Sequence, residues 1–306
     1  MPQDKVVSMH EAVARFVPDR ASVCMGTALE ALIPFAAGHE LIRQRRRNLT
    51  LVGPISDILF DQLIAAGCVR RIQAAWVGNV SAGLGHNYRR AVERGVPHPI
   101  EVEDHSNLTI AAALQAGAMG APYLPTRSLL GTGLLDSNPS FKQARDPFSG
   151  GPVVLIPALT PDVAILHVQR SDPEGHAHCW GTLGVTRQAA LAARRVIIVA
   201  EEIRPRELIL SDPGLVLAPA IKVAAVVHEP FGAYPSPVQG CYRRGHDFFH
   251  RYHEESRTEE GTRAWLDRWV YGIADWKGFL GRLGEDALSA VRITLPRLSE
   301  PLDYGA

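Results

Sequence analysis

Short apolar runs alternate with longer amphipathic segments along the first half of the chain. The apolar runs predict four strands, at Ser22–Met25, Leu49–Val52, Val69–Trp76 and Ile100–Glu103. Apolar residues at helical spacing predict the helices that follow them, at Glu30–Gln44, Ile55–Ala66, Asn87–Arg94 and Leu108–Met119. Strands and helices that alternate in this way form βαβ units. We therefore predict an α/β fold with an open parallel or mixed sheet and helices on both faces.

The second half continues this alternation less regularly. A helix is expected at Arg187–Arg194, and no repeat or linker divides the chain, so we expect one domain over residues 1–306. Short aliphatic runs suited to buried central strands occur at Val153–Ile156, Val163–Val168, Val196–Ala200 and Ala224–Val227.

Two further segments differ in pattern from the rest. Residues at about 248–284 are predicted to be helical, with Trp265, Trp269 and Phe279 packing against the body. Arg127–Gly151 contains several glycines and prolines and reads as a loop. A loop of this length inside a compact domain more often has a functional role than serves only as a connection.

The equal numbers of basic and acidic residues argue against two classes of binding protein. The chain has 32 Lys and Arg and 32 Asp and Glu, so its net charge is zero. Binders of nucleic acid or anionic membranes normally show a basic excess, and neither partner is expected. No apolar run approaches the ~20 residues of a membrane span, and the N-terminus lacks the pattern of a secretion signal. The four cysteines are scattered, and we expect a cytoplasmic protein without a metal site.

Candidate ligand-binding residues follow the predicted strands, because parallel sheets bind ligands beyond the carboxyl ends of their strands. Gly26 and Thr27 follow the first strand, where the amides of the next helix would point at an anion. A tight structural turn explains these two residues equally well. Asn79 and Ser81 lie in a loop with three glycines after the third strand, which suits close approach of a substrate.

Five consecutive polar residues follow the fourth strand. A helix begins at about this point, so Ser106 or Asp104 could simply be its N-cap. Capping explains one residue and not the whole stretch, so we favour a binding role. The stretch is Glu103-Asp104-His105-Ser106-Asn107.

Two other polar groups have competing interpretations. Asp172–Cys179 contains histidines and a cysteine that could bind a metal, but they are too close together to form a closed site unaided. A turn over Pro173–Gly175 followed by a strand is the better interpretation. Glu201 and Glu202 follow a strand, and a catalytic role and a solvated or ion-paired role are both open. These residues alone indicate an α/β enzyme-like domain with ligand loops.

Several stretches taken together resemble the A subunits of family I coenzyme A-transferases of the glutaconate CoA-transferase type. Two departures from that family are Thr27 and Ala28, where a glycine pair before an aromatic is usual, and Tyr234, where histidine is usual. The stretches that carry the resemblance are His167-Val168-Gln169, Ser171–Gly175, Trp180-Gly181, Ala200–Ile203, Pro230–Ser236, Glu103–Asn107 and Pro122–Pro125 leading to Gly131–Leu134.

The resemblance implies a heteromeric enzyme with an open α/β sheet, in which the partner is a B subunit. The acyl-CoA thioester is attacked by a glutamate of the B subunit, which gives an anhydride and then a glutamyl-CoA thioester, and an incoming carboxylate completes the exchange. The CoA thioester is a substrate, and no tightly bound cofactor is implied. This chain would contribute pocket walls and no catalytic nucleophile. The substrate-binding residues expected from it are Gly26, Thr27, Asn79, Ser81, Glu103, Asp104, Ser106, Asn107, Gly131 and Thr132.

Two rival functions remain open at this stage. Some relatives on the same scaffold are hydrolases that open a ring in steroid breakdown, and their A chains carry an acid near the position of Asn107. An amide cannot act as a base, which favours transfer. A non-catalytic ligand-binding module is disfavoured, because no helix-turn-helix is present. The acyl group stays undefined: Arg89, Arg90 and Arg127 could bind a second carboxylate, although surface arginines are common.

Overall fold

A sheet of eight strands forms the centre of the molecule, and the computed structural model describes residues 4–294. The strand order is β13-β12-β10-β1-β2-β3-β6, with the short β11 paired to β10. Neighbouring strands run parallel except β11, which is antiparallel to β10. The strands are β1 (Ser22–Cys24), β2 (Leu49–Ile55), β3 (Val69–Trp76), β6 (Glu101–Asp104), β10 (Val163–Ser171), β11 (Ala177–His178), β12 (Arg195–Ile203) and β13 (Val223–His228).

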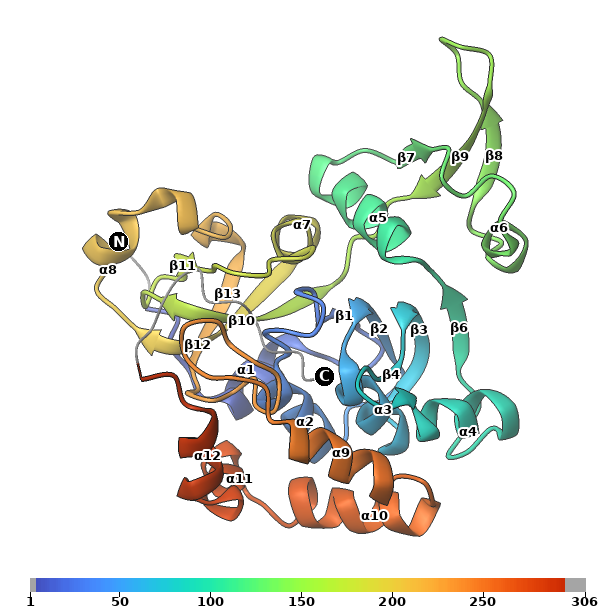
Figure 1. Ribbon diagram of the computed structural model, residues 1–306. Helices are drawn as coiled ribbons and strands as arrows, with labels where there is room; N and C mark the ends of the chain where they lie inside the picture. The colour runs from blue at the N-terminus through green and yellow to red at the C-terminus, as the bar shows by residue number, and fades with distance from the viewer. Residues whose placement is uncertain (1–3, 295–306) are drawn as a thin grey trace.

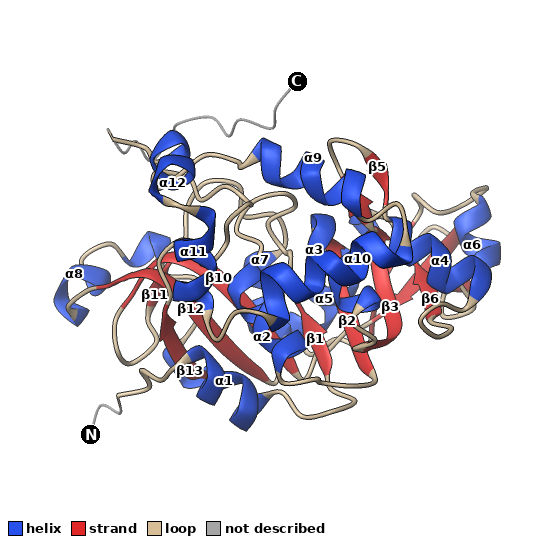
Figure 2. Ribbon diagram, turned by 90° about the horizontal axis from the view of Figure 1, so that it is seen from below, coloured by secondary structure: helices blue, strands red, loops and turns tan. Residues whose placement is uncertain are grey.

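Helices cover both faces of this sheet (Figure 1 and Figure 2). Helices α1 to α4 pack on one another along one face, and α5 packs against α7 on the other. Because both faces are covered, Val196–Ala200 of β12 is buried at every position. This is the parallel α/β arrangement that the alternating pattern predicts. The helices are α1 (Met9–Phe16), α2 (Phe35–Arg43), α3 (Asp57–Ala65), α4 (His86–Arg94), α5 (Asn107–Met119) and α7 (Thr186–Ala192).

The C-terminal helices form an outer layer beyond α2 and α3, drawn in orange and red in Figure 1. Trp265, Trp269 and Phe279 are buried and contact neighbouring rings, so they attach this layer to the body, as their sequence pattern predicts. The layer and the remaining short elements are α9 (His246–Glu255), α10 (Glu259–Leu266), a π-helical turn (Asp267–Tyr271), α11 (Trp276–Leu283), α12 (Glu285–Val291), α8 (Arg206–Leu210) and 3-10 turns at Pro213–Leu215 and Ala220–Lys222.

A small antiparallel sheet projects from the end of α5, and we call it the arm, residues 123–157 (Figure 1). Its strand order is β7-β9-β8, and its own small core includes Leu129, Phe141 and Val154. The prediction that Val153–Ile156 is a strand of the central sheet is therefore wrong, and Arg127–Gly151 is only partly a loop. The arm consists of β7 (Tyr123–Thr126), α6 (Gly133–Ser137), β8 (Lys142–Arg145) and β9 (Pro152–Pro157).

The first predicted helix also begins later than expected. Residues 27–34 are irregular, and α2 starts only after Pro34. Leu29 and Leu32 have φ values of +62° and +56°, which an α-helix does not allow. No helix within residues 4–294 is both long and apolar enough to cross a membrane.

Candidate functional site

The strand order of the central sheet reverses between β1 and β10. Strands β2, β3 and β6 are added on one side of β1, and β10, β12 and β13 lie on the other. In open parallel sheets the loops diverge at such a point, and ligands bind beyond the carboxyl ends of the strands there. We take the loops after β1, β2, β3 and β6 at this end of the sheet as the candidate site, because they carry the predicted residues, and we call this region the carboxyl edge.

The loop after β1 is tightly packed. Gly26 has a φ of +63°, and a methyl group there would overlap the hydroxyl of Ser56 and lie 2.5 Å from the Ile55 carbonyl oxygen. Thr27 is buried, and its hydroxyl lies 2.8 Å from that of Thr186. Because α2 begins only at Phe35, the helix amides expected beside Gly26 are not at this place. The turn interpretation fits this loop.

The loop after β3 is a short hairpin formed by β4 (Gly78–Asn79) and β5 (Gly83–Leu84). Asn79 is buried and donates its side-chain amide to the Phe249 carbonyl at 2.7 Å. The N–H of Val80 donates to Asp57 Oδ1 at 3.3 Å. Ser81 is exposed, and its Oγ accepts a hydrogen bond from Arg244 Nη2 at 3.2 Å. The hairpin is thus supported from beneath by α3 and by the segment that enters α9.

A buried ion pair lies under this hairpin. Arg244 Nη2 donates to Asp57 Oδ2 at 2.7 Å, and both side chains are fully buried. Burial raises the pKa of Asp57 to about 6, although Arg244 and the Val80 N–H act in the opposite direction. Arg244 also lies 3.6 Å from the centre of the Phe249 ring. Its Nε and Nη1 have no hydrogen-bond partner among residues 4–294.

The half-buried Glu30 belongs to the same electrostatic environment. Burial raises the pKa of Glu30, and the charge of Arg244 opposes this. Glu30 in turn raises the pKa of Asp57. None of Glu30, Asp57 and Arg244 was among the residues predicted for the site.

A second polar cluster lies at the end of β6, around Glu103. His105 Nε2 lies 3.3 Å from Glu103 Oε1, and Gln73 Nε2 donates to Glu103 Oε2 at 2.9 Å. Hydrogen bonds from His105 and then Gln73 lower the pKa of Glu103 to about 2, against the effect of its partial burial. The carboxylate is therefore kept ionised by partners within the chain.

The remaining polar residues of this stretch have separate roles. Ser106 is the N-cap of α5: its Oγ accepts the Thr109 N–H at 3.2 Å, and Thr109 Oγ1 accepts the Ser106 N–H at 2.8 Å. The Asp104 carbonyl accepts the side-chain amide of Asn138 at 2.8 Å, which ties the arm to β6. The side chains of Asp104 and Asn107 are exposed at the carboxyl edge.

Gly131 and Thr132 are placed apart from the residues after β1 and β3. Both are exposed and lie in the arm, and Thr132 Oγ1 donates to the Leu129 carbonyl at 2.8 Å. The predicted residues thus fall into three groups: those after β1 and β3, those after β6, and those on the arm.

Glu201 is buried and accepts three hydrogen bonds, whereas Glu202 forms surface ion pairs. His167 Nε2 and the Tyr242 hydroxyl contact Glu201 Oε1 at 2.6 and 2.8 Å, and the Phe231 N–H donates to Oε2 at 2.8 Å. Glu202 lies 2.8 Å from Arg204 Nε. Glu201 therefore fixes the loop that starts at Phe231, and this loop supports residues 30–33 beside the site.

The histidines of Asp172–Cys179 belong to a turn and hairpin. Asp172 Oδ1 accepts the N–H groups of Glu174 and His176, each at 2.9 Å, and β11 then pairs with β10. His178 Nε2 lies 2.7 Å from the Ile209 carbonyl oxygen. The turn interpretation is confirmed.

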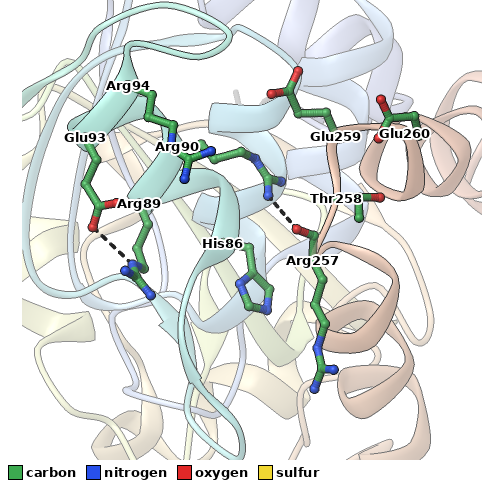
Figure 3. Close-up of a pocket in the computed structure, with 9 residues that line it drawn as sticks. All are labelled: His86, Arg89, Arg90, Glu93, Arg94, Arg257, Thr258, Glu259 and Glu260. Carbon is green, nitrogen blue, oxygen red and sulfur yellow. Dashed lines mark hydrogen bonds and ion pairs between the residues drawn. The ribbon is translucent and has the colours of Figure 1, made fainter.

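A hollow of about 360 Å³ lies between α4 and the start of α10 (Figure 3). Two of its arginines are already engaged: Arg89 Nε lies 3.2 Å from Glu93 Oε1, and Arg90 Nη1 donates to the Arg257 carbonyl at 3.1 Å. Glu259 also lines the hollow. The hollow is therefore nearly balanced in charge. Arg89 and Arg90, the candidates for a second carboxylate, line it, whereas the ten predicted substrate-binding residues do not.

Comparison with known proteins covers nearly the whole chain. Residues 6–229 match the family model described as Coenzyme A transferase. The chain is 37% identical over 282 residues to the A subunit of 3-oxoadipate CoA-transferase from Pseudomonas knackmussii, covering 92% of this chain and 99% of that one. It is 30% identical over 316 residues to the A subunit of glutaconate CoA-transferase from Acidaminococcus fermentans, with 98% of each chain covered.

The fold is also similar to that of a solved CoA-transferase structure. The crystal structure of glutaconate coenzyme A-transferase from Acidaminococcus fermentans superposes with a TM-score of 0.90 at 30% identity, over 97% of this chain and 98% of that chain.

Proposed function

The chain belongs to the coenzyme A transferase family as one of its A subunits, and from this premise we propose how it takes part in transfer. It assembles with a B subunit, and the assembled enzyme moves CoA between an acyl-CoA and a free carboxylic acid. The B subunit supplies a glutamate nucleophile, and this chain supplies one wall of the site. Two relatives are named for 3-oxoadipate and glutaconate, which supports a dicarboxylic acid as the acceptor.

The observation that carries this proposal is that two carboxylates at the carboxyl edge are held by partners within the chain. Asp57 is buried in an ion pair with Arg244, and Glu103 is held by Gln73 and His105. A carboxylate that attacks a thioester must be free to reach it. Neither of these two acids is free to attack, and we assign the exposed Asp104 to substrate contact. The similarity to A subunits of two CoA-transferases supports a nucleophile on the partner polypeptide.

The proposed reaction conserves the energy of the thioester. The partner's carboxylate attacks the acyl carbon, the C–S bond breaks, and CoA leaves as a thiolate with an acyl-glutamyl anhydride remaining. The thiolate then attacks the glutamyl carbon of the anhydride, which releases the first carboxylate and leaves glutamyl-CoA. The second acid repeats these steps in reverse order and leaves as the new acyl-CoA.

The exposed residues of the carboxyl edge are the ones we assign to substrate contact, and the buried ones to support. The contact group is Ser81, Asp104 and Asn107, flanked by Gly131 and Thr132 of the arm. The supporting group is Gly26, Thr27 and Asn79, which are buried, and Glu103 and Ser106, which are partly buried.

The test is a transfer assay of the chain alone and of the complex isolated with it. Each is incubated with acetyl-CoA and glutaconate or 3-oxoadipate, and the new acyl-CoA is measured by chromatography. Parallel samples are treated with acyl-CoA and borohydride, which reduces a glutamyl-CoA thioester, and the modified residue is located by mass spectrometry. We expect transfer by the complex only, with the modified glutamate on the partner.

Other outcomes refute defined parts of the proposal. Modification of an acid of this chain, such as Asp104, would contradict the placement of the nucleophile. Release of free CoA without a new acyl-CoA would identify a thioester hydrolase. Equal rates with butyrate and with the two dicarboxylates would contradict the proposed acceptor class.

A further inference from the structure

The exposed Ser81 hydroxyl is joined to a fully buried cation. Arg244 Nη2 donates to Asp57 Oδ2 at 2.7 Å and to Ser81 Oγ at 3.2 Å. The guanidinium itself is shielded from solvent, while Ser81 is exposed at the tip of the hairpin. The buried Arg244 therefore affects the exposed surface of the carboxyl edge through its hydrogen bond to the Ser81 hydroxyl.

This contact determines the direction of the Ser81 hydroxyl hydrogen. A serine hydroxyl has one donor hydrogen and two acceptor lone pairs. The N–H of Arg244 occupies a lone pair, and the positive guanidinium repels the hydroxyl hydrogen. The hydrogen consequently points away from Arg244, toward the exposed side. A hydroxyl that accepts from a cation is also a stronger donor, because hydrogen bonds in a chain polarise one another.

Stability alone is a poor explanation for the Asp57–Arg244 pair. A buried ion pair is often no more stabilising than apolar residues of the same volume, because both charges lose their hydration. Arg244 also leaves Nε and Nη1 without an acceptor among residues 4–294. Asp57 has a φ of +45°, a strained value for a residue with a side chain, and such strain concentrates at functional sites.

We propose that Arg244, held in place by Asp57, is a positioning residue that orients the Ser81 hydroxyl as a hydrogen-bond donor to the acyl oxygen of the substrate. The inference rests on the proposed transferase function. The acyl oxygen gains negative charge when a carboxylate attacks the thioester, so a donor fixed in advance stabilises the transition state more than the bound substrate. Ser81 is the group that touches the substrate, and Arg244 and Asp57 act through it.

The same geometry makes the orientation dependent on pH. The groups that face Asp57 are Arg244, Glu30 and the N–H of Val80. Burial and Glu30 raise the pKa of Asp57, to about 6, against the opposing effects of Arg244 and Val80. Below this pH, Asp57 takes up a proton and no longer holds the charge of Arg244. Transfer by the complex should therefore fall as the pH drops through about 6.

The test is a double-mutant cycle in the assembled complex. Ser81→Ala removes the donor, Arg244→Lys keeps the charge but loses the planar fork, and a third variant combines them. For the loss of one such donor, kcat/KM is expected to fall on the order of 100-fold in Ser81→Ala. Arg244→Lys should lose a large part of this factor, and the combined variant should be no slower than Ser81→Ala. Losses that multiply would refute action through Ser81.

A second variant separates positioning from folding. Asp57→Asn with Arg244→Met removes both charges at similar volume, so the melting temperature should stay at or near that of the parent complex. Its kcat/KM should nevertheless fall as in Ser81→Ala, without the decrease in activity below about pH 6 that we expect of the parent. Full activity in this variant, or an unchanged decrease below that pH, would refute the proposal.

Tyr252→Phe is the matched structural control, since the Tyr252 hydroxyl on α9 donates to Asp61 Oδ2 at 2.7 Å, away from the hairpin tip. It should lower the melting temperature and leave kcat/KM within about twofold of the parent, because only interactions at the reacting group change transition-state binding. A parent complex that transfers no CoA would overturn the proposed function and this inference together. An active parent with multiplying losses would overturn the inference alone.

Discussion

Replacing Gly26 by alanine tests whether the loop after β1 is shaped by backbone conformation or by close packing. Gly26 has a φ of +63°, and a methyl group would lie 2.8 Å from the Ser56 Cα in addition to overlapping its hydroxyl. Gly120, at the C-terminus of α5, has a φ of +69° with open space around the same position. The two glycines therefore share the backbone strain and differ only in the room available.

The expected magnitudes follow from this difference. A side chain in the left-handed region costs roughly 1–2 kcal/mol, and both variants bear this cost. Gly26→Ala must also displace the end of β2, and overpacking of this kind costs about 1–3 kcal/mol more. For a chain of this size each kcal/mol lowers Tm by roughly 2 °C. We thus expect a fall of about 2–4 °C for Gly120→Ala and about 4–10 °C for Gly26→Ala.

Thermal unfolding of the full-length chain, followed by circular dichroism at one scan rate, measures both variants. The entropy that alanine removes from the unfolded state is the same in each variant and cancels in the comparison. Equal falls in Tm would show that the contact with Ser56 relaxes at no cost. A larger fall in Gly120→Ala would refute the reasoning altogether.

Two further predictions concern the buried carboxylates. Tyr242→Phe removes one of the three donors to Glu201, so the free energy of unfolding should fall by about 1–3 kcal/mol. The control Tyr123→Phe, on the exposed β7, should not change Tm. Equal Tm values for the two variants would contradict the role given to Glu201. The pKa of Glu103 in the folded chain, about 2, lies below its ordinary value of 4.5, so its contribution to stability is present above pH 4.5 and is lost as the pH falls toward 2. Gln73→Leu removes a donor to Glu103, so the decrease of Tm in acid should begin at a higher pH than in the parent. Curves of Tm against pH that superimpose for the two proteins would refute the role given to Gln73.

Strands could be predicted wherever burial on both faces makes a run continuously apolar. Val196–Ala200 is such a run, and it lies within β12. β3 occupies Val69–Trp76, the residues that the sequence predicts, although Arg70 and Arg71 interrupt its apolar pattern. The start of α2 could not be found from spacing alone, because apolar residues continue at helical intervals before it. Pro34 was the available signal, since proline is tolerated at the start of a helix and excluded from its interior.

The arm shows that an apolar run predicts a buried strand but not the strand it pairs with. Val153–Ile156 is a strand, but an aliphatic run indicates burial and not the identity of its neighbour. The strands that pair with it carry weak signals: Lys142–Arg145 is mostly polar, and Tyr123–Thr126 contains Pro125. Their pairing depends on contacts with α5 and with one another, which no local pattern records.

For the site, topology carries more information than motifs. Asn79, Ser81 and Glu103 could be placed near one edge because parallel strands end on the same side of a sheet. Arg244 had no such signal, since it stands between Arg243 and Gly245 in an irregular segment that resembles an exposed turn. Its burial results from stacking on Phe249 and pairing with Asp57, two contacts that only the folded chain brings together.

The position of β1 between β2 and β10 also affects how the chain is made. Ser22 at the start of β1 bonds through its N–H and its hydroxyl to Asp162, 140 residues later, just before β10. At a synthesis rate of about 5–20 residues per second, this delay lasts roughly 7–28 s. During that time one edge of β1 has no partner strand on the nascent chain. An unpaired strand edge is a template for edge-to-edge aggregation, so the emerging N-terminal half carries this hazard until β10 is made.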